Sequence, residues 1–122
     1  VMQAYTLSVL VDYFGDVPFT EAFKGLENLN PAVDDQEELY TAILGILDQG
    51  ITNLRTAPNA LAPAITDFYY GGNTTRWIRL ANSIKLKIYL NLRNVAANVP
   101  AATAGITALL ATTEGVITAQ TD

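Results

Sequence analysis

The stretch NTTRWIRLANSIKLKIYLNLRNV, residues 73–95, decides the fold class of this chain. Apolar residues recur in it every three or four positions and trace one helical face, made of Trp77, Ala81, Ile84, Ile88, Leu92 and Val95. The basic residues lie mostly off that face. Asn73 or Thr74 can cap the first turn, because its side-chain oxygen can accept a hydrogen bond from a free backbone N–H group. The sequence therefore predicts a long amphipathic helix with one buried face.

A second helix is predicted upstream, over about residues 34–55. Asp34 is the expected N-cap, and Glu37 three residues later completes a capping box. Further acids in the first turn suit the positive end of the helix dipole. The predicted buried face is broad and consists of Leu39, Ile43, Ile46, Gly50 and Leu54, widened by Tyr40, Leu44, Leu47 and Ile51. Pro58 and Pro63 mark a loop after this helix.

Two more helices flank this pair. One is predicted over about residues 1–14 and ends at Gly15, with Pro18 preventing its continuation. Its expected apolar stripe is Met2, Tyr5, Val9 and Tyr13, with Leu10 and Phe14 beside it. Pro100 ends the long helix, and a weaker Ala/Thr-rich helix follows over about 102–113, broken by Gly115. We therefore predict an all-α fold of about four helices, packed antiparallel or as a helical-repeat array.

Composition narrows the possible functions. The 122 residues contain neither histidine nor cysteine, which excludes thiolate and imidazole zinc sites and any nucleophile activated by histidine. A net charge of −5 argues against binding to nucleic acid. The N-terminus lacks the pattern of a signal peptide, and apolar periodicity already runs at residue 1. We expect residues 1–122 to be part of a single larger helical domain, with N- and C-terminal portions missing.

Charge is distributed unevenly along the chain. Residues 1–67 hold ten acids and two bases, a net charge of −8, whereas residues 68–113 hold five bases and no acid. The basic segment either packs beside the acidic one or presents a charged docking face to a partner. Sequence alone favours the first interpretation, because complementary surface charge is common.

Two acidic clusters are candidates for chemistry. Asp12, Asp16 and Glu21 lie around the first turn, and paired carboxylates can hydrolyse glycosidic bonds. The cluster at residues 34–38 is explained by helix capping. Calcium at Asp12/Asp16 or Asp34/Asp35 is conceivable, but the twelve-residue calcium-loop pattern is absent. We expect no catalytic residue and no cofactor, with a structural calcium ion as the one alternative.

Three consecutive aromatic residues precede the long helix. Phe68, Tyr69 and Tyr70 stand between Asp67 and Gly71-Gly72. Exposed flat rings would suit the apolar faces of sugar rings, whereas buried rings would fill the core where the chain enters the helix. Trp77 lies on the predicted apolar stripe and is expected in the core.

Three blocks of sequence, in order, resemble the SusD/RagB-like proteins. Residues 12–22, Asp-Tyr-Phe-Gly-Asp-Val-Pro-Phe-Thr-Glu-Ala, are similar to that family's "D-x-y-G-D-v-P-y-s-E-A" segment. Residues 34–40 with Ile43-Leu44 and Leu47-Asp48 resemble its next helix. Residues 67–72, Trp77 and 81–87 resemble its "D-x-i-y-G-g … W-x-k-f-A-N-S-L-k-L-R" pattern. The chain departs from the family pattern at Val33, where an aromatic is usual, and at Lys87, where arginine is usual.

The resemblance implies a tetratricopeptide-like helical scaffold in an outer-membrane lipoprotein of Bacteroidetes-type bacteria. Such proteins are non-enzymatic and capture glycans, or in some members peptides, at the extracellular face for a SusC-like TonB-dependent transporter. Their lipid-anchoring cysteine would lie outside this chain. Binding of nucleic acid is not expected. The alternative function is a helical protein–protein interaction module without a small-molecule ligand.

The candidate residues fall into two groups, and the resemblance carries over no ligand contact, because those residues vary between members of the family. The residues expected to be structural are Gly15, Asp16, Pro18, Glu21, Asp34, Tyr40, Trp77 and Asn82. The residues expected to contact ligand are Phe19, Tyr69 and Tyr70.

Overall fold

The computed structural model describes residues 1–56 and 67–119, and within these it is helical without a β-strand. The elements in chain order are α1 (Met2–Phe14), the 3-10 turn η1 (Gly25–Glu27), α2 (Gln36–Thr56), α3 (Thr74–Leu92), the 3-10 turn η2 (Ala96–Asn98) and α4 (Val99–Leu110). The predicted all-α fold of about four helices is confirmed. The loop predicted around Pro58 and Pro63 lies outside the described residues.

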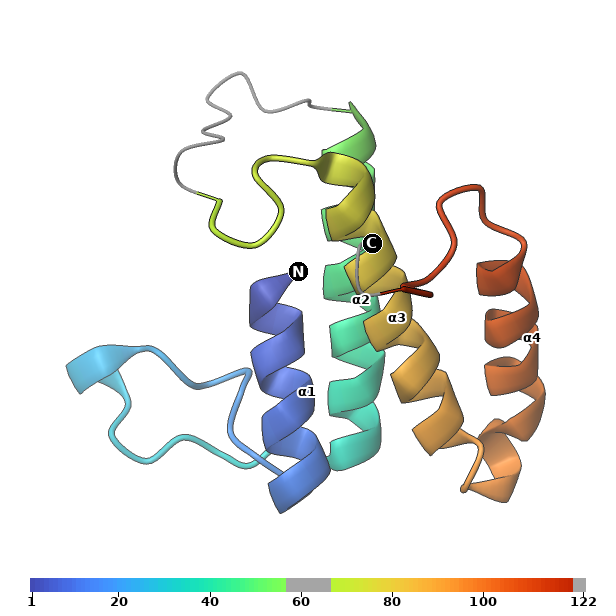
Figure 1. Ribbon diagram of the computed structural model, residues 1–122. Coiled ribbons are helices and arrows are strands. Elements are labelled where there is room, and N and C mark those ends of the chain that lie inside the picture. The colour runs from blue at the N-terminus through green and yellow to red at the C-terminus, as the bar shows by residue number, and fades with distance from the viewer. Residues whose placement is uncertain (57–66, 120–122) are drawn as a thin grey trace.

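The four α-helices lie side by side in chain order, and each runs antiparallel to the one before it (Figure 1). α2 contacts both α1 and α3, and α3 in turn contacts α4. The connection between α1 and α2, residues 15–35, extends away from the helices (Figure 1). The connection that precedes α2 and residues 67–73, which precede α3, lie near opposite ends of α2 (Figure 1).

The core forms where α1, α2 and α3 meet. Each helix contributes side chains with no measurable exposure, among them Ala4 and Val11 of α1, Ile43 and Leu47 of α2 and Ile88 of α3. Burying a side chain of the size of leucine or isoleucine stabilises the fold by about 1.5–3 kcal/mol. α2 lies in the middle and has the broad buried face expected from its sequence.

The predicted stripe of α1 is wrong. Tyr5 is 46% and Tyr13 81% exposed, whereas the buried face is formed by Ala4, Leu7, Ser8 and Val11. α1 has apolar residues all round, so periodicity does not choose a face. The buried face includes the small side chains of Ala4 and Ser8, which allow close packing against a neighbouring helix, so tertiary packing decides which face is buried.

Three details of the other helices also differ from expectation. α3 buries Ile78, whereas Trp77 is only half-buried and stands outside the core, and Val95 lies beyond the helix end and is exposed. α4 begins at Val99, so Pro100 lies in its first turn, where proline is tolerated because that N–H has no partner within the helix.

The basic segment packs beside the acidic one, as the charge pattern favoured. On α3, Lys85 forms an ion pair with Asp48 of α2, and Lys87 forms one with Asp12 of α1. These pairs place positive charge of α3 against carboxylates of both preceding helices. None of the described helices is long and apolar enough to cross a membrane.

Candidate functional site

Residues 67–73, which we call the aromatic turn, are organised by a single carboxylate. Asp67 Oδ1 accepts hydrogen bonds from the backbone N–H groups of Tyr69 and Tyr70, each at 3.0 Å. Its Oδ2 accepts from Gly72 N–H at 2.9 Å and from the Trp77 indole Nε1–H at 2.6 Å. Two of these donors precede the glycines and two follow the bend, so Asp67 fixes the turn to the start of α3.

The rings of the turn divide into supporting and exposed ones. Tyr70 meets the Trp77 ring edge to face with a centroid distance of 5.1 Å, and Tyr69 does so at 6.0 Å. Tyr70 is half-buried by its contacts, but Tyr69 is 69% exposed and Phe68 94% exposed. Of the two interpretations left open by the sequence, exposure therefore holds for Phe68 and Tyr69. Phe68 is the more exposed ring, although the sequence directed attention to the tyrosines.

The electrostatics of Asp67 follow from these donors. Desolvation by itself raises the pKa of the carboxyl group, but the hydrogen bonds from Trp77 and from the N–H groups of Tyr70, Gly72 and Tyr69 outweigh it and lower the pKa to about 2. Asp67 is thus ionised at any physiological pH. All four donors point at an anion, which strengthens each bond relative to a neutral pair.

The connection between α1 and α2, which we call the first connection (residues 15–35), is organised by Asp34. Its Oδ2 accepts from the N–H groups of Phe19 at 2.7 Å and Thr20 at 2.9 Å, and its Oδ1 accepts from Thr20 Oγ1–H at 2.6 Å. The predicted N-cap role of Asp34 is therefore wrong. Asp35 caps α2 instead, accepting from Glu37 N–H at 2.8 Å and Glu38 N–H at 3.3 Å.

Glu21 holds the outer part of the first connection. Its Oε2 accepts from Asn28 Nδ2–H at 3.1 Å and from Ala32 N–H at 3.0 Å. The segment between these contacts exposes three large apolar side chains, Phe23, Leu26 and Leu29, at 93%, 91% and 79%. The connection is thus held in place by polar contacts while its apolar side chains face outward.

A polar cleft of about 720 Å³ lies where α1, α2 and α3 meet near the first connection. In it the Tyr40 hydroxyl donates to Asp12 Oδ1 at 2.8 Å, and Asn91 Nδ2–H donates to the same oxygen at 3.1 Å. Lys87 pairs with the other oxygen of Asp12. Burial raises the pKa of the Tyr40 hydroxyl, and its bond to Asp12 raises it further. One residue of α2 and two of α3 therefore contact Asp12 of α1, so the three helices are joined at this cleft.

A second aspartate of the cleft, Asp16, also accepts a hydrogen bond from the protein. Asp16 Oδ1 accepts from Gln36 N–H at 2.9 Å, which satisfies a free donor at the start of α2. Gln36 in turn donates from Nε2 to the carbonyl of Val11 at 3.3 Å. Among the residues that the structure describes, no group of three or more acids is placed to hold a metal ion.

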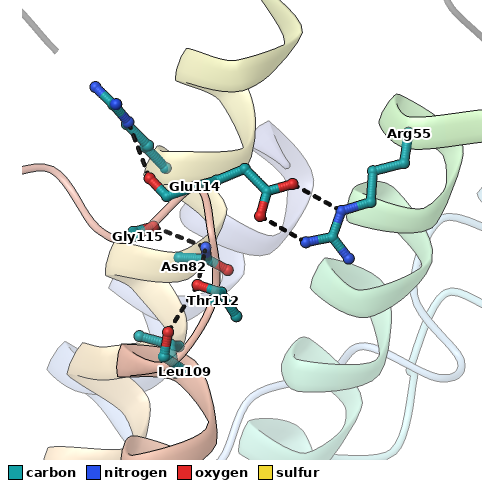
Figure 2. A network of polar contacts seen from close by, with 7 residues as sticks. Arg55, Asn82, Leu109, Thr112, Glu114 and Gly115 are labelled. Carbon is teal, nitrogen blue, oxygen red and sulfur yellow. Dashed lines mark hydrogen bonds and ion pairs between the residues drawn. The ribbon is translucent and has the colours of Figure 1, made fainter.

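Asn82 fastens the segment after α4 onto α3 (Figure 2). It is 3% exposed, and its Nδ2–H donates to the Gly115 carbonyl at 2.8 Å and to Thr112 Oγ1 at 3.4 Å. Beside it, Glu114 receives two hydrogen bonds from the Arg55 guanidinium at the end of α2, at 2.8 and 2.9 Å (Figure 2). Sequence reasoning missed Arg55 and Glu114, because 59 positions separate them.

The three predicted ligand contacts do not form one site. Phe19 is half-buried and packs against the core in the first connection, at the start of α2. Tyr69 and Tyr70 belong to the aromatic turn, a segment that lies near the other end of α2 (Figure 1). α2 has 21 residues and is therefore about 30 Å long. The second exposed ring of the aromatic turn, next to Tyr69, is therefore that of Phe68 and not that of Phe19.

The comparison with protein families decides the identity of this scaffold. The model of the SusD-like family described as "Starch-binding associating with outer membrane" matches residues 1–122. The chain belongs to the SusD-like family. That description concerns the family as a whole. The helical scaffold matches the tetratricopeptide-like fold that the resemblance implied.

Solved structures of SusD-like proteins show the same fold. A SusD homologue from Bacteroides uniformis is similar with a TM-score of 0.84 and 28% identity, over 98% of this chain and 24% of that one. A SusD/RagB family protein from Bacteroides thetaiotaomicron has a TM-score of 0.80 and 28% identity, over 97% and 23%. A chitin-binding SusD homologue from Flavobacterium johnsoniae shares the fold with a TM-score of 0.66 at 22% identity, over 93% and 25%.

The SusD-like chain described here spans about a quarter of the length of these relatives. No curated protein matches it. The matched quarter includes the four helices, the first connection and the aromatic turn.

Proposed function

We propose that this chain is the helical scaffold portion of a cell-surface protein that captures glycans and delivers them, unaltered, to a SusC-like TonB-dependent transporter. The observation that carries the proposal is the family match over residues 1–122. A lipid anchor outside these residues would hold the protein on the extracellular face of the outer membrane. Because the ligand can also be a peptide in such a family, peptides are tested as ligands together with glycans.

The hydrogen bonding of the acids supports binding without catalysis. General acid–base chemistry needs a carboxyl group that reaches the substrate with a suitably shifted pKa. Asp16 accepts a hydrogen bond from the backbone of α2, and Glu21 accepts two within its own connection. The pKa of Glu21 is lowered by the bonds from Ala32 N–H and Asn28, which is the wrong direction for a general acid.

The test uses the full-length protein on a glycan array, followed by calorimetry on each glycan that binds. We expect saturable binding and a recovered ligand of unchanged mass. Absence of binding to every polysaccharide and peptide offered would refute nutrient capture. Hydrolysis of the ligand that disappears in Asp16→Ala and Glu21→Ala, with folding intact, would show an enzyme instead.

The exposed apolar side chains of the first connection favour a second candidate function, docking of another protein. Phe23, Leu26 and Leu29 protrude from a segment whose backbone is fixed by Glu21 and Asp34. Exposed apolar groups that cluster on a fixed segment are typical of protein contacts. This function is compatible with glycan capture, because the aromatic turn lies at the other end of α2.

Co-purification with the transporter tests the docking function. Leu26→Ser with Leu29→Ser should reduce recovery of the transporter, whereas Lys24→Ser, an exposed polar position of the same connection, should not. If the two variants recover the transporter equally, the first connection has no part in docking.

A further inference from the structure

The first connection presents an aromatic ring from strained backbone. Among the residues that the structure describes, Phe23 is the one non-glycine residue with a positive φ, of 65°. A bulky residue rarely adopts this left-handed conformation, because its Cβ comes too close to a carbonyl oxygen. Strain of this kind persists only where the surrounding structure enforces it, and it is typical of functional sites. Phe23 is also 93% exposed, so packing of its own ring does not account for the conformation.

Hydrogen bonds on both sides of Phe23 fix this backbone. Just before it, the Ala22 N–H donates to the Phe19 carbonyl at 3.2 Å. Just after it, the Glu27 N–H donates to the Lys24 carbonyl at 3.2 Å. Carboxylate contacts hold the two arms of the connection together. A side chain presented from a backbone that is already fixed loses little entropy when a partner binds it.

Leu26 and Leu29 extend the apolar surface that begins with Phe23. They are 91% and 79% exposed. The connection that carries all three side chains extends away from the helices (Figure 1). Large apolar side chains that gather on one exposed segment mark contact sites for other molecules. We call residues 23–29 the apolar projection.

The segment that carries the apolar projection is strongly acidic. Residues 15–38 hold seven acids and one base, Lys24, a net charge of −6. Within the part of the chain that the structure describes, none of these seven carboxylates forms an ion pair. Lys87 of the neighbouring cleft is paired with Asp12. The negative charge of the segment is therefore left for solvent or a partner to neutralise.

An apolar centre within an acidic segment defines the surface that would complement it. Protein interfaces have an apolar core and a polar rim, and arginine is enriched in them. A protein pocket with apolar walls and with lysine or arginine at its edge would cover the apolar projection and attract the carboxylates around it. A membrane surface with anionic headgroups would repel the same carboxylates. The charge therefore favours a protein partner over a lipid surface.

We infer that the apolar projection inserts as an anchor into an apolar pocket of a partner protein, with Phe23 as the central contact, and that lysine and arginine side chains border this pocket. The inference rests on the proposed docking function and adds to it the chemistry of the partner's surface. Because the carboxylates act at the border of the contact, added salt weakens the association without abolishing it.

The experiment measures the affinity of the full-length protein for the purified SusC-like transporter by calorimetry. Phe23→Ala should bind about tenfold or more weakly than the wild type, because an aromatic ring at the centre of an interface contributes much of the binding free energy. The matched control is Phe68→Ala, which removes a ring of the aromatic turn that is 94% exposed. This control should bind the transporter as the wild type does.

Two further variants separate contact with the partner from folding. Phe23→Gly adopts the positive φ without strain, so it should melt close to the wild type and yet bind as weakly as Phe23→Ala. Glu27→Gln removes an exposed carboxylate next to Leu26. Its affinity should fall less steeply with added salt than that of the wild type.

Several results would overturn the inference. If Phe23→Ala binds as the wild type does while Leu26→Ser with Leu29→Ser does not bind, the docking function stands and Phe23 is not the anchor. Affinity that is unchanged by salt would refute the basic border of the pocket.

The remaining outcomes concern what covers the ring. A melting temperature several degrees lower in Phe23→Gly would show that another part of the same chain covers it. Faster sedimentation of the free wild type than of Phe23→Ala would show that a second copy of the protein does. A wild type that does not bind the transporter would refute the docking function together with the anchor.

Discussion

The first connection and the aromatic turn are both held in place by carboxylates, but they use different numbers of them. Both fix exposed backbone outside the helices by directing N–H groups at aspartate or glutamate oxygens. The first connection, residues 15–35, divides its contacts between Asp34 and Glu21, with Asp16 tied to the start of α2. In the aromatic turn, residues 67–73, the carboxylate contacts all go to Asp67. The restraint on the backbone is therefore distributed over several carboxylates in the first connection and concentrated on one carboxylate in the aromatic turn.

The two regions also expose different side chains. The first connection exposes aliphatic and aromatic residues along an extended segment, whereas the turn exposes two adjacent rings on a compact support. Distributed restraint tolerates the loss of one contact, because the others still fix the chain. Concentrated restraint gives a more sharply defined surface that a single substitution can undo.

The largest effect is expected from Asp67→Ala. Four donors lose their acceptor at once, and the Trp77 indole N–H is among them. The melting temperature should fall by several degrees, and Trp77, the one tryptophan of the chain, should report the opened turn by a red shift of its fluorescence. Asp67→Asn is the matched control and should be intermediate, because its amide keeps one acceptor oxygen. An unchanged spectrum in Asp67→Ala would show that the restraint is not concentrated there.

The next effect is a dependence on acid that should distinguish the two regions. The folded-state pKa of Asp67 is about 2, below the ordinary value of 3.8, so its contribution is complete above pH 3.8 and is lost as the pH falls towards 2. The wild type should therefore lose stability over this interval. Asp67→Ala should lose less, which melting curves recorded at successive pH values will show.

Asp34 and Glu21 modify this acid dependence in the same direction. Their pKa values are lowered too, by the Thr20 hydroxyl and backbone in one case and by Ala32 N–H and Asn28 in the other. Alanine variants of these two residues should retain the acid transition of the aromatic turn, seen in the Trp77 fluorescence. Loss of that transition in either variant would contradict the assignment to Asp67.

A smaller effect is expected in the first connection. Asp34→Ala should accelerate hydrogen exchange of the Phe19 and Thr20 amides, and Glu21→Ala should accelerate that of Ala32, because each amide donates to one carboxylate. Each single variant should melt close to the wild type, and the double variant should lose more than the sum of the two. Unfolding by Asp34→Ala alone would show that this region is as concentrated as the turn.

The smallest effect is expected where α2 meets the segment after α4. Arg55 and Glu114 form a two-bond ion pair, but their side chains are 48% and 20% exposed. An exposed pair of this kind contributes about 0.5 kcal/mol, and added salt screens it. A double-mutant cycle with Arg55→Ala and Glu114→Ala should give that coupling. A coupling energy above about 2 kcal/mol would show that the Arg55–Glu114 pair is a major contributor to stability and would contradict this order of effects.

Pairs of adjacent, chemically similar residues show what the sequence cannot predict: which of the two takes a given structural role. Asp34 and Asp35 carry the same carboxylate at the start of a helix, so either fits a cap. Asp35 caps α2 because Asp34 is engaged by Thr20, fourteen positions away. Trp77 and Ile78 are both apolar, yet Ile78 is buried and Trp77 leaves the core for the Asp67 carboxylate.

The exposed rings of the aromatic turn were only partly predictable for the same reason. Three aromatics beside two glycines indicated a turn with rings, and Asp67 before them is typical of an aspartate that accepts from the following backbone. Which ring faces water depends on Trp77, which lies in α3: Tyr70 packs against its ring, whereas Phe68 is 94% exposed.

The sequence by itself determined the four helices, their order and approximate bounds, and the membership of the family, because helical periodicity, capping and motif blocks depend on neighbours within a few residues. Only the tertiary structure decided which face of α1 is buried, which aspartate caps α2, and that Phe68 and Tyr69 rather than Phe19 present exposed rings. Burial and hydrogen-bond partnership are set between residues far apart in the chain, and α2, packed between α1 and α3, is what brings those residues together.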